Sequence, residues 1–412
     1  MKKISFFSIV SAVVLLAVLT SCSGKSESNM TYRINQHTGD KVALLGFGCM
    51  RLPMMDDGNG NHIPDQDSIN FLIDEAIRNG INYFDVAPSY MNGMNESSVG
   101  KALARHKRDK FFIATKLSTS ETTLEAQKGM YEKSFKELQV DYIDYYLLHN
   151  VGRVDKDLFR ARFIESGILE FLLEERQAGR IRNLGFSFHG DVSIYDTLFE
   201  IGIQWDFVMI QMNYIDWQNA TAPRNVNAEY LYNKALANNA QCVIMEPLFG
   251  GRLGNLGPVA RRPLEAVNPN ATPAEWAFRY VGSFDNVLTV LSGMNHIDHL
   301  RENVKTFSPL VPLNQEEHEA LAVVTEIMTT AGFIDCTGCN YCVPCPFGVP
   351  IPDILLRYNE YISERKEIDK NDPVLQQAGT CKGDICKLCE KECPQRIGIV
   401  EQMKKIYKLV SE

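Results

Sequence analysis

Short apolar runs alternate with longer amphipathic segments along most of the chain. Eight runs rich in β-branched and aromatic residues predict strands, at residues 43–48, 82–86, 111–115, 142–148, 181–187, 207–211, 242–245 and 287–291. Segments with a helical spacing of apolar residues lie between them, at 68–79, 122–138, 163–178, 228–237 and 273–281. Eight strands separated by helices within about 280 residues are typical of a (β/α)8 barrel.

The expected fold class is therefore α/β, with a TIM barrel as the main domain. A doubly wound parallel sheet is the alternative, but it usually has fewer strands and a glycine fingerprint after the first one. The stretch Gly-Phe-Gly at 46–48 lacks the third glycine of that fingerprint. The glycines within 251–257 are not followed by the Lys-Ser/Thr pair of a phosphate loop, so we expect a flexible barrel loop there.

The chain has 412 residues, which is long for a single domain. A charged helical segment at 309–332 leads out of the predicted barrel. The region beyond it holds eight of the eleven cysteines and another helical pattern at 354–366. We therefore expect the barrel to occupy residues 31–330 and a small, mostly α-helical domain to occupy residues 331–412.

The N-terminus has the pattern of an export signal. Lys2 and Lys3 precede an apolar run of about 16 residues, shorter than the roughly 20 that span a bilayer, and a polar stretch follows Cys22. The sequence Leu-Thr-Ser-Cys at 19–22 resembles the processing site of bacterial lipoproteins, which implies lipidation of Cys22. We expect a signal peptide at 1–21, a tether at 22–30 and a lipid-anchored protein of the bacterial cell envelope. An uncleaved anchor that holds the chain at the cytoplasmic face of the membrane is the alternative.

The formal net charge of −9 argues against nucleic acid as a partner, because phosphate backbones bind to basic surfaces. A local basic groove for a phosphate-containing cofactor remains compatible with that charge.

Polar side chains stand where predicted strands end, which is the position of active sites in TIM barrels. Asp85 ends the second strand and Tyr90 lies in the loop after it. Lys116 and His149 end the next two strands. An ammonium group beside a tyrosine favours the phenolate, a carboxylate can orient the lysine, and a histidine can polarise a carbonyl oxygen. We expect the four to form a site for carbonyl reduction or alcohol oxidation.

Across residues 32–308 the chain resembles the aldo/keto reductase superfamily. The stretch Phe-Asp-Val-Ala-Pro-Ser-Tyr at 84–90, Ala-Thr-Lys at 114–116 and Leu-Leu-His at 147–149 carry the resemblance. It implies that Tyr90 is the general acid, that Asp85 and Lys116 tune it, and that His149 orients the substrate carbonyl.

The same resemblance implies a site for a nicotinamide cofactor, NADP or NAD. The residues it assigns to that cofactor are Gly48, Ser187, Gln211, Asn213, Met245, Glu246, Ser292, Gly293, Glu302 and Asn303. Phe188 stands where the family often has an asparagine, and Met245 where many members have an aromatic ring. The residues at 293–296 are Gly-Met-Asn-His, without the cation that normally selects NADP, so the choice between the two cofactors stays open.

Eight cysteines form two runs that each end in Cys-Pro, as in ferredoxins. They are Cys336, Cys339, Cys342 and Cys345, followed by Cys381, Cys386, Cys389 and Cys393. In two-cluster ferredoxins the cysteine before proline binds the other cluster. By that logic one [4Fe–4S] cluster takes positions 336, 339, 342 and 393, and a second takes 345, 381, 386 and 389. Two structural zinc sites or four disulfides are the alternatives.

A ferredoxin-like tail also occurs in one subgroup of aldo/keto reductases. The leading hypothesis is an oxidoreductase that uses NAD(P)H and iron–sulfur clusters on a small carbonyl or alcohol, with an electron-transfer protein as a possible partner. The alternatives are a non-catalytic electron-transfer or redox-sensing protein whose barrel binds a ligand, and a zinc-stabilised binding protein.

Overall fold

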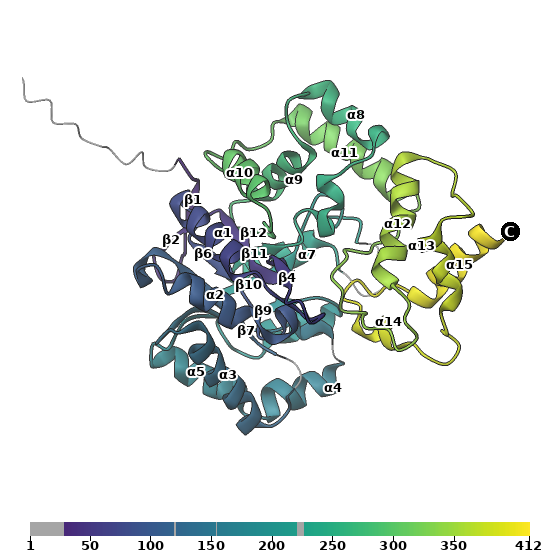
Figure 1. The fold of residues 1–412 in the computed structure, drawn as a ribbon. Helices are drawn as coiled ribbons and strands as arrows, with labels where there is room; N and C mark the ends of the chain where they lie inside the picture. Colours follow the sequence, from purple (N-terminus) through teal and green to yellow (C-terminus); the bar gives the residue numbers. More distant parts are fainter. Residues whose placement is uncertain (1–28, 119–120, 154, 221–225) are drawn as a thin grey trace, which may run out of the picture.

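The computed structural model describes residues 29–118, 121–153, 155–220 and 226–412. The predicted signal peptide, the tether up to residue 28 and the lipidation site Cys22 lie outside the described residues. Figure 1 shows a barrel surrounded by helices, with the segment that follows α11 packed against one side of it. We call residues 331–412 the C-terminal unit.

Eight parallel strands close into a barrel, which confirms the predicted TIM barrel. The order around the barrel is β3, β6, β7, β8, β9, β10, β11 and β12, and β12 pairs with β3. Their bounds are Leu45–Gly48, Tyr83–Asp85, Phe112–Leu117, Ile143–Leu148, Ile181–Phe188, Phe207–Gln211, Gln241–Met245 and Val287–Ser292. Because all strands run the same way, the residues that end them meet at one rim.

The observed strands agree with the apolar runs to within a few residues. The range 207–211 coincides with β10, but the first run, 43–48, is divided. Its start belongs to an N-terminal hairpin, β1 (Tyr32–Ile34) and β2 (Lys41–Ala43), and only the remainder enters the barrel. An apolar run alone does not show this change of direction.

Helices surround the barrel, and several begin at side chains that cap their free N–H groups. Asp65 accepts a hydrogen bond from the backbone of Ser68 at the start of α1, and Thr272 caps α9 in the same way. The barrel helices are α1 (Gln66–Arg78), α2 (Asn95–Leu103), α3 (Leu124–Leu138), α4 (Lys156–Phe159), α5 (Ile168–Gln177), α6 (Val192–Glu200), α7 (Ala228–Ala237), α8 (Pro258–Val267), α9 (Pro273–Gly282) and α10 (Ile297–Thr306). The helix predicted at 163–178 is interrupted, because Gly167 has a φ of +80° and separates a π-helical segment from α5.

The N-terminal hairpin lies at the end of the barrel opposite the predicted site. Asn35 follows β1, and its amide donates hydrogen bonds to the hydroxyl of Tyr145 at 2.9 Å and to Oδ1 of Asn183 at 3.0 Å. Both partners are barrel residues near the starts of β8 and β9. The hairpin therefore closes this end of the barrel with buried polar contacts.

Helix α11 (Gln315–Thr330) connects the barrel to the C-terminal unit and packs on α8. A capping box of Asn314 and Glu317 starts it. The Glu317 carboxylate also accepts two hydrogen bonds of 2.7 Å from Arg279 in α9, in a buried pair. This pair fixes the exit of the chain from the barrel.

The C-terminal unit is mostly helical and has its own apolar core, which includes Ile354, Leu355, Met403 and Ile406. Its helices are α12 (Ile351–Glu364), α13 (Pro373–Gln376), α14 (Leu388–Glu392) and α15 (Ile399–Ser411). They lie together beside the barrel (Figure 1). Among the described residues, no helix is long and apolar enough to cross a membrane.

Candidate active site

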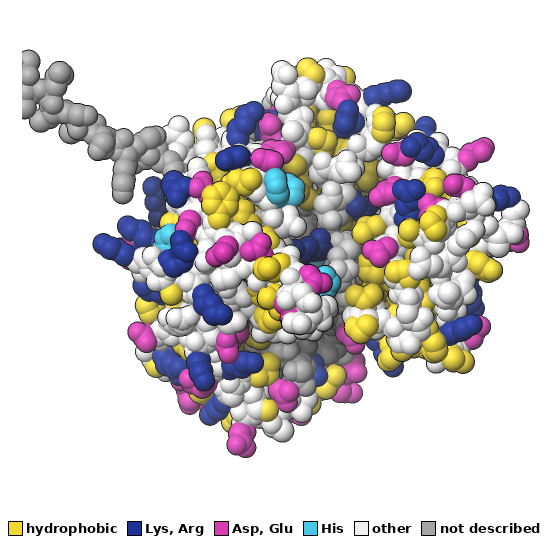
Figure 2. Space-filling model, viewed as in Figure 1, with side chains coloured by type: hydrophobic (Ala, Val, Ile, Leu, Met, Phe, Trp, Pro, Cys, Tyr) yellow, Lys and Arg dark blue, Asp and Glu magenta, His cyan; other side chains and the backbone are white. Residues whose placement is uncertain are grey.

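The carboxyl ends of the strands enclose a cavity of about 250 Å³. Asp85, Tyr90, Lys116 and His149 all line it. They come from β6, from the short helix η2 (Tyr90–Gly93) after it, from β7 and from the end of β8. The structure therefore brings together the four side chains that the strand ends predicted. Figure 2 shows that the surface is hollowed between the barrel and the C-terminal unit.

Asp85 and Lys116 form a buried ion pair at the base of this cavity. Nζ of Lys116 donates to both carboxylate oxygens of Asp85, at 2.8 and 2.9 Å, and to the backbone oxygen of Val86 at 2.7 Å. Burial raises the pKa of Asp85, although Lys116 opposes this. The ammonium group thus has three oxygen partners within the protein.

Tyr90 lies above this pair, with its ring centroid 4.8 Å from Nζ of Lys116 and 6.2 Å from the centroid of the His149 ring. The expectation that the lysine lowers the pKa of Tyr90 is not met. Burial raises the pKa of Tyr90 well above its usual value, and the nearby carboxylate of Asp85 adds to this. The neutral phenol is therefore the stable form, and a phenol is a proton donor.

Six of the ten residues predicted to contact a nicotinamide cofactor also line the cavity. They are Gly48, Ser187, Met245, Glu246, Ser292 and Gly293. The other four are held in contacts of their own: Asn303 donates to Oγ of Ser292 at 2.9 Å, and Glu302 accepts from Thr272. Gln211 and Asn213 lie at the end of β10.

The amides of Gln211 and Asn213 share a carboxylate that the sequence patterns did not single out. Each donates to Oδ2 of Asp216 at 2.7 Å. Burial raises the pKa of Asp216 to about 6, and the two amide donors reduce that shift. Asp216 follows Asn213 by three residues in a loop, where no periodicity marks a buried group.

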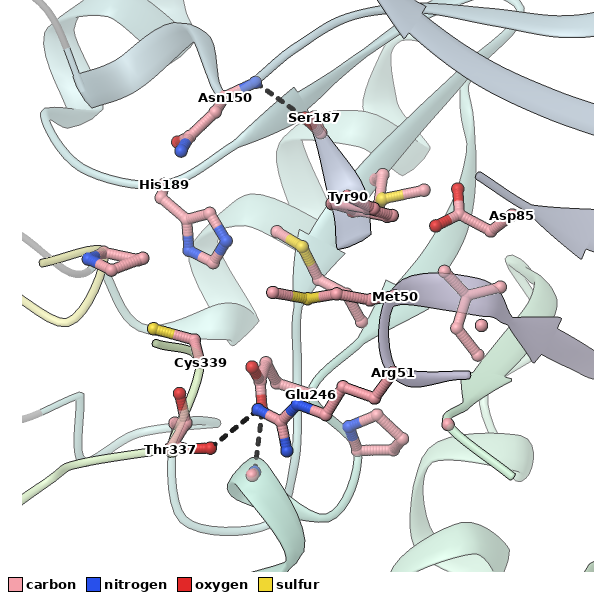
Figure 3. A pocket seen from close by; sticks show the side chains of 18 of the residues that line it. Met50, Arg51, Asp85, Tyr90, Asn150, Ser187, His189, Glu246, Thr337 and Cys339 are labelled. Atoms are coloured by element: carbon pink, nitrogen blue, oxygen red, sulfur yellow. Dashed lines mark hydrogen bonds between the residues drawn. The ribbon is translucent and has the colours of Figure 1, made fainter. Parts of the chain in front are cut away.

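Residues of the C-terminal unit complete the wall of the cavity. They are Thr337, Cys339, Tyr341, Pro394 and Gln395. Nη2 of Arg51, in the loop after β3, donates to the backbone oxygen of Thr337 at 2.8 Å. Figure 3 shows Arg51, Glu246 and Thr337 together on one side of the pocket and Tyr90 and Asp85 on another. No sequence signal placed this unit over the barrel.

The loop after β11 carries a carboxylate, Glu246, in the lining of the cavity. Glu246 has a φ of +55°, a strained value for this residue type, and its carboxylate accepts a hydrogen bond from the backbone of Gly250 at 2.7 Å. Thr337 lies directly on Gly250. Thr337 of the C-terminal unit therefore covers part of this loop. The loop predicted at 251–257 is also packed rather than flexible, since Gly257 abuts the backbone of Ser363 in α12.

The eight cysteines of the C-terminal unit line two cavities. Cys336, Cys339, Cys342 and Cys393 line one. The other is lined by Cys345, Cys381, Cys386 and Cys389, with Cys342 also at its edge. Within the described ranges, no three His, Cys, Asp or Glu side chains are grouped so that they could hold a metal ion. The remaining described cysteines, Cys49 and Cys242, are buried in the barrel.

A sequence model described as "Aldo/keto reductase family" matches residues 44–326. The chain is 26% identical over 303 residues to an uncharacterized oxidoreductase, YqkF, of Bacillus subtilis, which covers 68% of this chain and 92% of that protein. It is 24% identical over 313 residues to L-galactose dehydrogenase of Arabidopsis thaliana, which covers 71% and 92%. The family match ends before Cys336.

Solved structures give the same result for the barrel. The holo form of aldo-keto reductase AKR11C1 from Bacillus halodurans is 26% identical, with a TM-score of 0.56, and covers 72% of this chain and 96% of that one. The thermostable aldo-keto reductase Tm1743 is 22% identical, with a TM-score of 0.57, and shows the fold alone.

Proposed function

Since this chain belongs to the aldo/keto reductase family, we propose that it reduces a small carbonyl compound, or oxidises the matching alcohol, in the barrel cavity. The observation that carries the proposal is the meeting of Asp85, Tyr90, Lys116 and His149 at one cavity. Tyr90, Lys116 and His149 can each hold or move a proton, and Asp85 orients Lys116.

Each side chain has a distinct role in this proposal. Tyr90 donates a proton to the oxygen that becomes the alcohol, and its raised pKa keeps the phenol protonated. Lys116 places a positive charge beside the tyrosine ring, held in position by Asp85. His149, across the cavity, orients the carbonyl oxygen by a hydrogen bond.

Membership of the family implies NADP or NAD as the hydride donor. Ser187, Met245, Ser292 and Gly293 line the cavity and would hold the nicotinamide end. When bound, the nicotinamide supplies a hydride to the carbonyl carbon. The rest of a dinucleotide would need the surface of the β11 loop that Thr337 covers.

A tyrosine-to-phenylalanine pair tests the proposed chemistry. Tyr90→Phe removes the proton donor and should lower kcat/KM for a panel of small aldehydes by about 100-fold or more. Tyr83→Phe is the matched control, because Tyr83 is a buried β6 tyrosine whose hydroxyl has no hydrogen-bond partner among the described residues. Full activity in Tyr90→Phe would contradict the proposed role.

We further propose that the two cysteine sets bind [4Fe–4S] clusters, which pass electrons to or from a protein partner. The gathering of each predicted set around one cavity supports this. In a cluster each thiolate binds a different iron. Each set supplies four thiols, the number of ligands that a [4Fe–4S] cluster needs.

Iron analysis tests this part of the proposal. The chain purified without oxygen should contain about eight iron and eight sulfide per molecule, and Cys339→Ala and Cys386→Ala should each lower both by about half. Cys242→Ala, in the barrel, should leave both unchanged. Zinc in place of iron would contradict the cluster assignment.

We also propose that Cys22 is lipidated and anchors the protein in a bacterial cell envelope. Residues 19–22 support this by their likeness to a lipoprotein processing site. Mass spectrometry of the mature N-terminus should find a lipidated cysteine, and Cys22→Ser should release the protein from membranes.

A further inference from the structure

The C-terminal unit presents two groups to the part of the barrel that a nicotinamide dinucleotide would use. Gln395 reaches Gln211, and Thr337 covers the loop after β11. Gln395 lies two residues after Cys393, and Thr337 directly follows Cys336. Both cysteines belong to the same predicted cluster set. The two contacts therefore depend on one small region of the C-terminal unit.

Gln395 and Gln211 form a reciprocal amide pair. Nε2 of Gln395 donates to Oε1 of Gln211 at 3.0 Å, and Nε2 of Gln211 donates back to Oε1 of Gln395 at 3.3 Å. Both side chains are buried, with 2% and 6% of their surface exposed. Together with the bond to Asp216, this pair uses both amide hydrogens of Gln211.

A nicotinamide carries the same chemical group as a glutamine side chain, a carboxamide with one acceptor and two donors. Gln395 thus offers Gln211 the hydrogen bonds that a nicotinamide carboxamide would offer. A dinucleotide that used Gln211 would have to displace it. Leaving a buried amide without a partner is unfavourable, so a dinucleotide that displaced Gln395 would have to replace its hydrogen bonds to Gln211.

Thr337 blocks the adjoining stretch of the groove. A Cβ built on Gly250 would lie 2.4 Å from Cα and 2.5 Å from the backbone oxygen of Thr337, so no ligand atom fits between them. The bond from Arg51 and an ion pair of 3.3 Å between Arg252 and Asp335 hold this segment in place. The β11 loop, in which the family resemblance assigns Glu246 to the cofactor, is therefore covered.

We propose that Gln395 and Thr337 determine whether the barrel admits a nicotinamide dinucleotide. In the docked arrangement they contact Gln211 and the β11 loop, which the proposed function assigns to the cofactor, so cofactor binding and docking of the C-terminal unit exclude each other. This inference rests on the proposed function, which assigns the cavity to a carbonyl substrate and a nicotinamide cofactor. Because both are binding events of one chain, whatever weakens docking strengthens cofactor binding.

Equilibrium binding of NADH and NADPH to the full chain tests this proposal. Energy transfer from the three tryptophans, Trp205, Trp217 and Trp276, to the reduced nicotinamide reports binding without turnover. Gln395→Ala should bind at least about fivefold more tightly than the natural chain, which corresponds to the loss of one or two hydrogen bonds from the docked state. Gln377→Ala, an exposed glutamine of the same unit, should leave the affinity unchanged.

Gln395→Met separates the amide from the volume of the side chain, since it keeps the length and removes the hydrogen bonds. It should tighten binding about as much as Gln395→Ala. The proposal would be overturned if only Gln395→Ala bound the dinucleotides more tightly, or if both variants bound them equally or more weakly than the natural chain. It would also be overturned if neither dinucleotide bound at about millimolar concentration. If Tyr90→Phe turned over as fast as the natural chain, the proposed function would be overturned, but the measured cofactor affinities would not be affected.

Discussion

Lys116 donates hydrogen bonds to both carboxylate oxygens of Asp85, and both side chains are almost completely buried. A buried ion pair behaves as one unit, because removing one partner leaves the other as an uncompensated charge. The arrangement of the site and the stability of the barrel rim therefore depend on the same pair.

Lys116→Met should lower the free energy of unfolding by about 3–5 kcal/mol, because it leaves Asp85 without its partner. The double variant with Asp85→Asn should recover a large part of that loss, while both variants lose carbonyl reduction by about 100-fold or more. Urea denaturation and steady-state kinetics measure the two effects. Additive losses of stability would show that the two residues do not act as a pair.

Tyr90 should remain a proton donor at a pH where a free tyrosine begins to ionise. Burial raises the pKa of Tyr90, so the neutral phenol persists to higher pH than the usual value near 10. A titration of tyrosinate absorbance should therefore be the same for the natural chain and Tyr90→Phe up to about pH 10. An additional ionisation near about pH 8 that Tyr90→Phe removes would show that Lys116 dominates after all.

Asp216→Asn should stabilise the protein at neutral pH. Burial raises the pKa of Asp216 to about 6 in the folded chain, above the unfolded value, so its ionisation opposes folding as the pH rises from about 4 to 6. An asparagine oxygen can still accept from Gln211 and Asn213. We expect a gain of roughly 1–3 kcal/mol above about pH 6, which disappears toward about pH 4 as the natural carboxyl becomes protonated. Denaturation curves across this range measure it, and a gain independent of pH would contradict the cause.

Gly257→Ala should loosen the C-terminal unit. A Cβ at Gly257 would lie 2.0 Å from the backbone oxygen of Ser363 in α12, so one of the two segments must move, at a cost of about 1–3 kcal/mol. Gly129→Ala in α3 is the control, because nothing lies within 4 Å of its Cβ and alanine favours the helix. Limited proteolysis of residues 331–412 should accelerate in the first variant only.

The barrel and its four polar side chains could be predicted because both follow from local patterns. Alternation of apolar runs shows where strands end, and parallel strands bring those ends together, so Asp85, Lys116 and His149 needed no knowledge of distant contacts. The ionisation of Tyr90 could not be predicted in this way. The convergence of the strand ends suggested that Lys116 lowers the pKa of Tyr90, whereas the surrounding burial has the larger effect.

The contribution of the C-terminal unit to the cavity could not be predicted either. Gln395 meets Gln211 across 184 positions of sequence, and Thr337 meets Arg51 across 286. Both lie outside helices and strands, beside cysteines whose spacing predicts metal ligands but gives no information about a partner surface. Contacts between two folded units depend on tertiary shape, for which a single sequence offers no periodic signal.

The N-terminal hairpin has a consequence for the kinetics of the site. Because Asn35 and its bonds to Tyr145 and Asn183 close the far end of the barrel, small molecules exchange with the cavity at the rim where the C-terminal unit lies. Entry and release then follow the seam between the two units, where the surface is hollowed (Figure 2). The rates of substrate entry and product release therefore depend on the side chains of both units that line this rim, as well as on the chemistry at Tyr90.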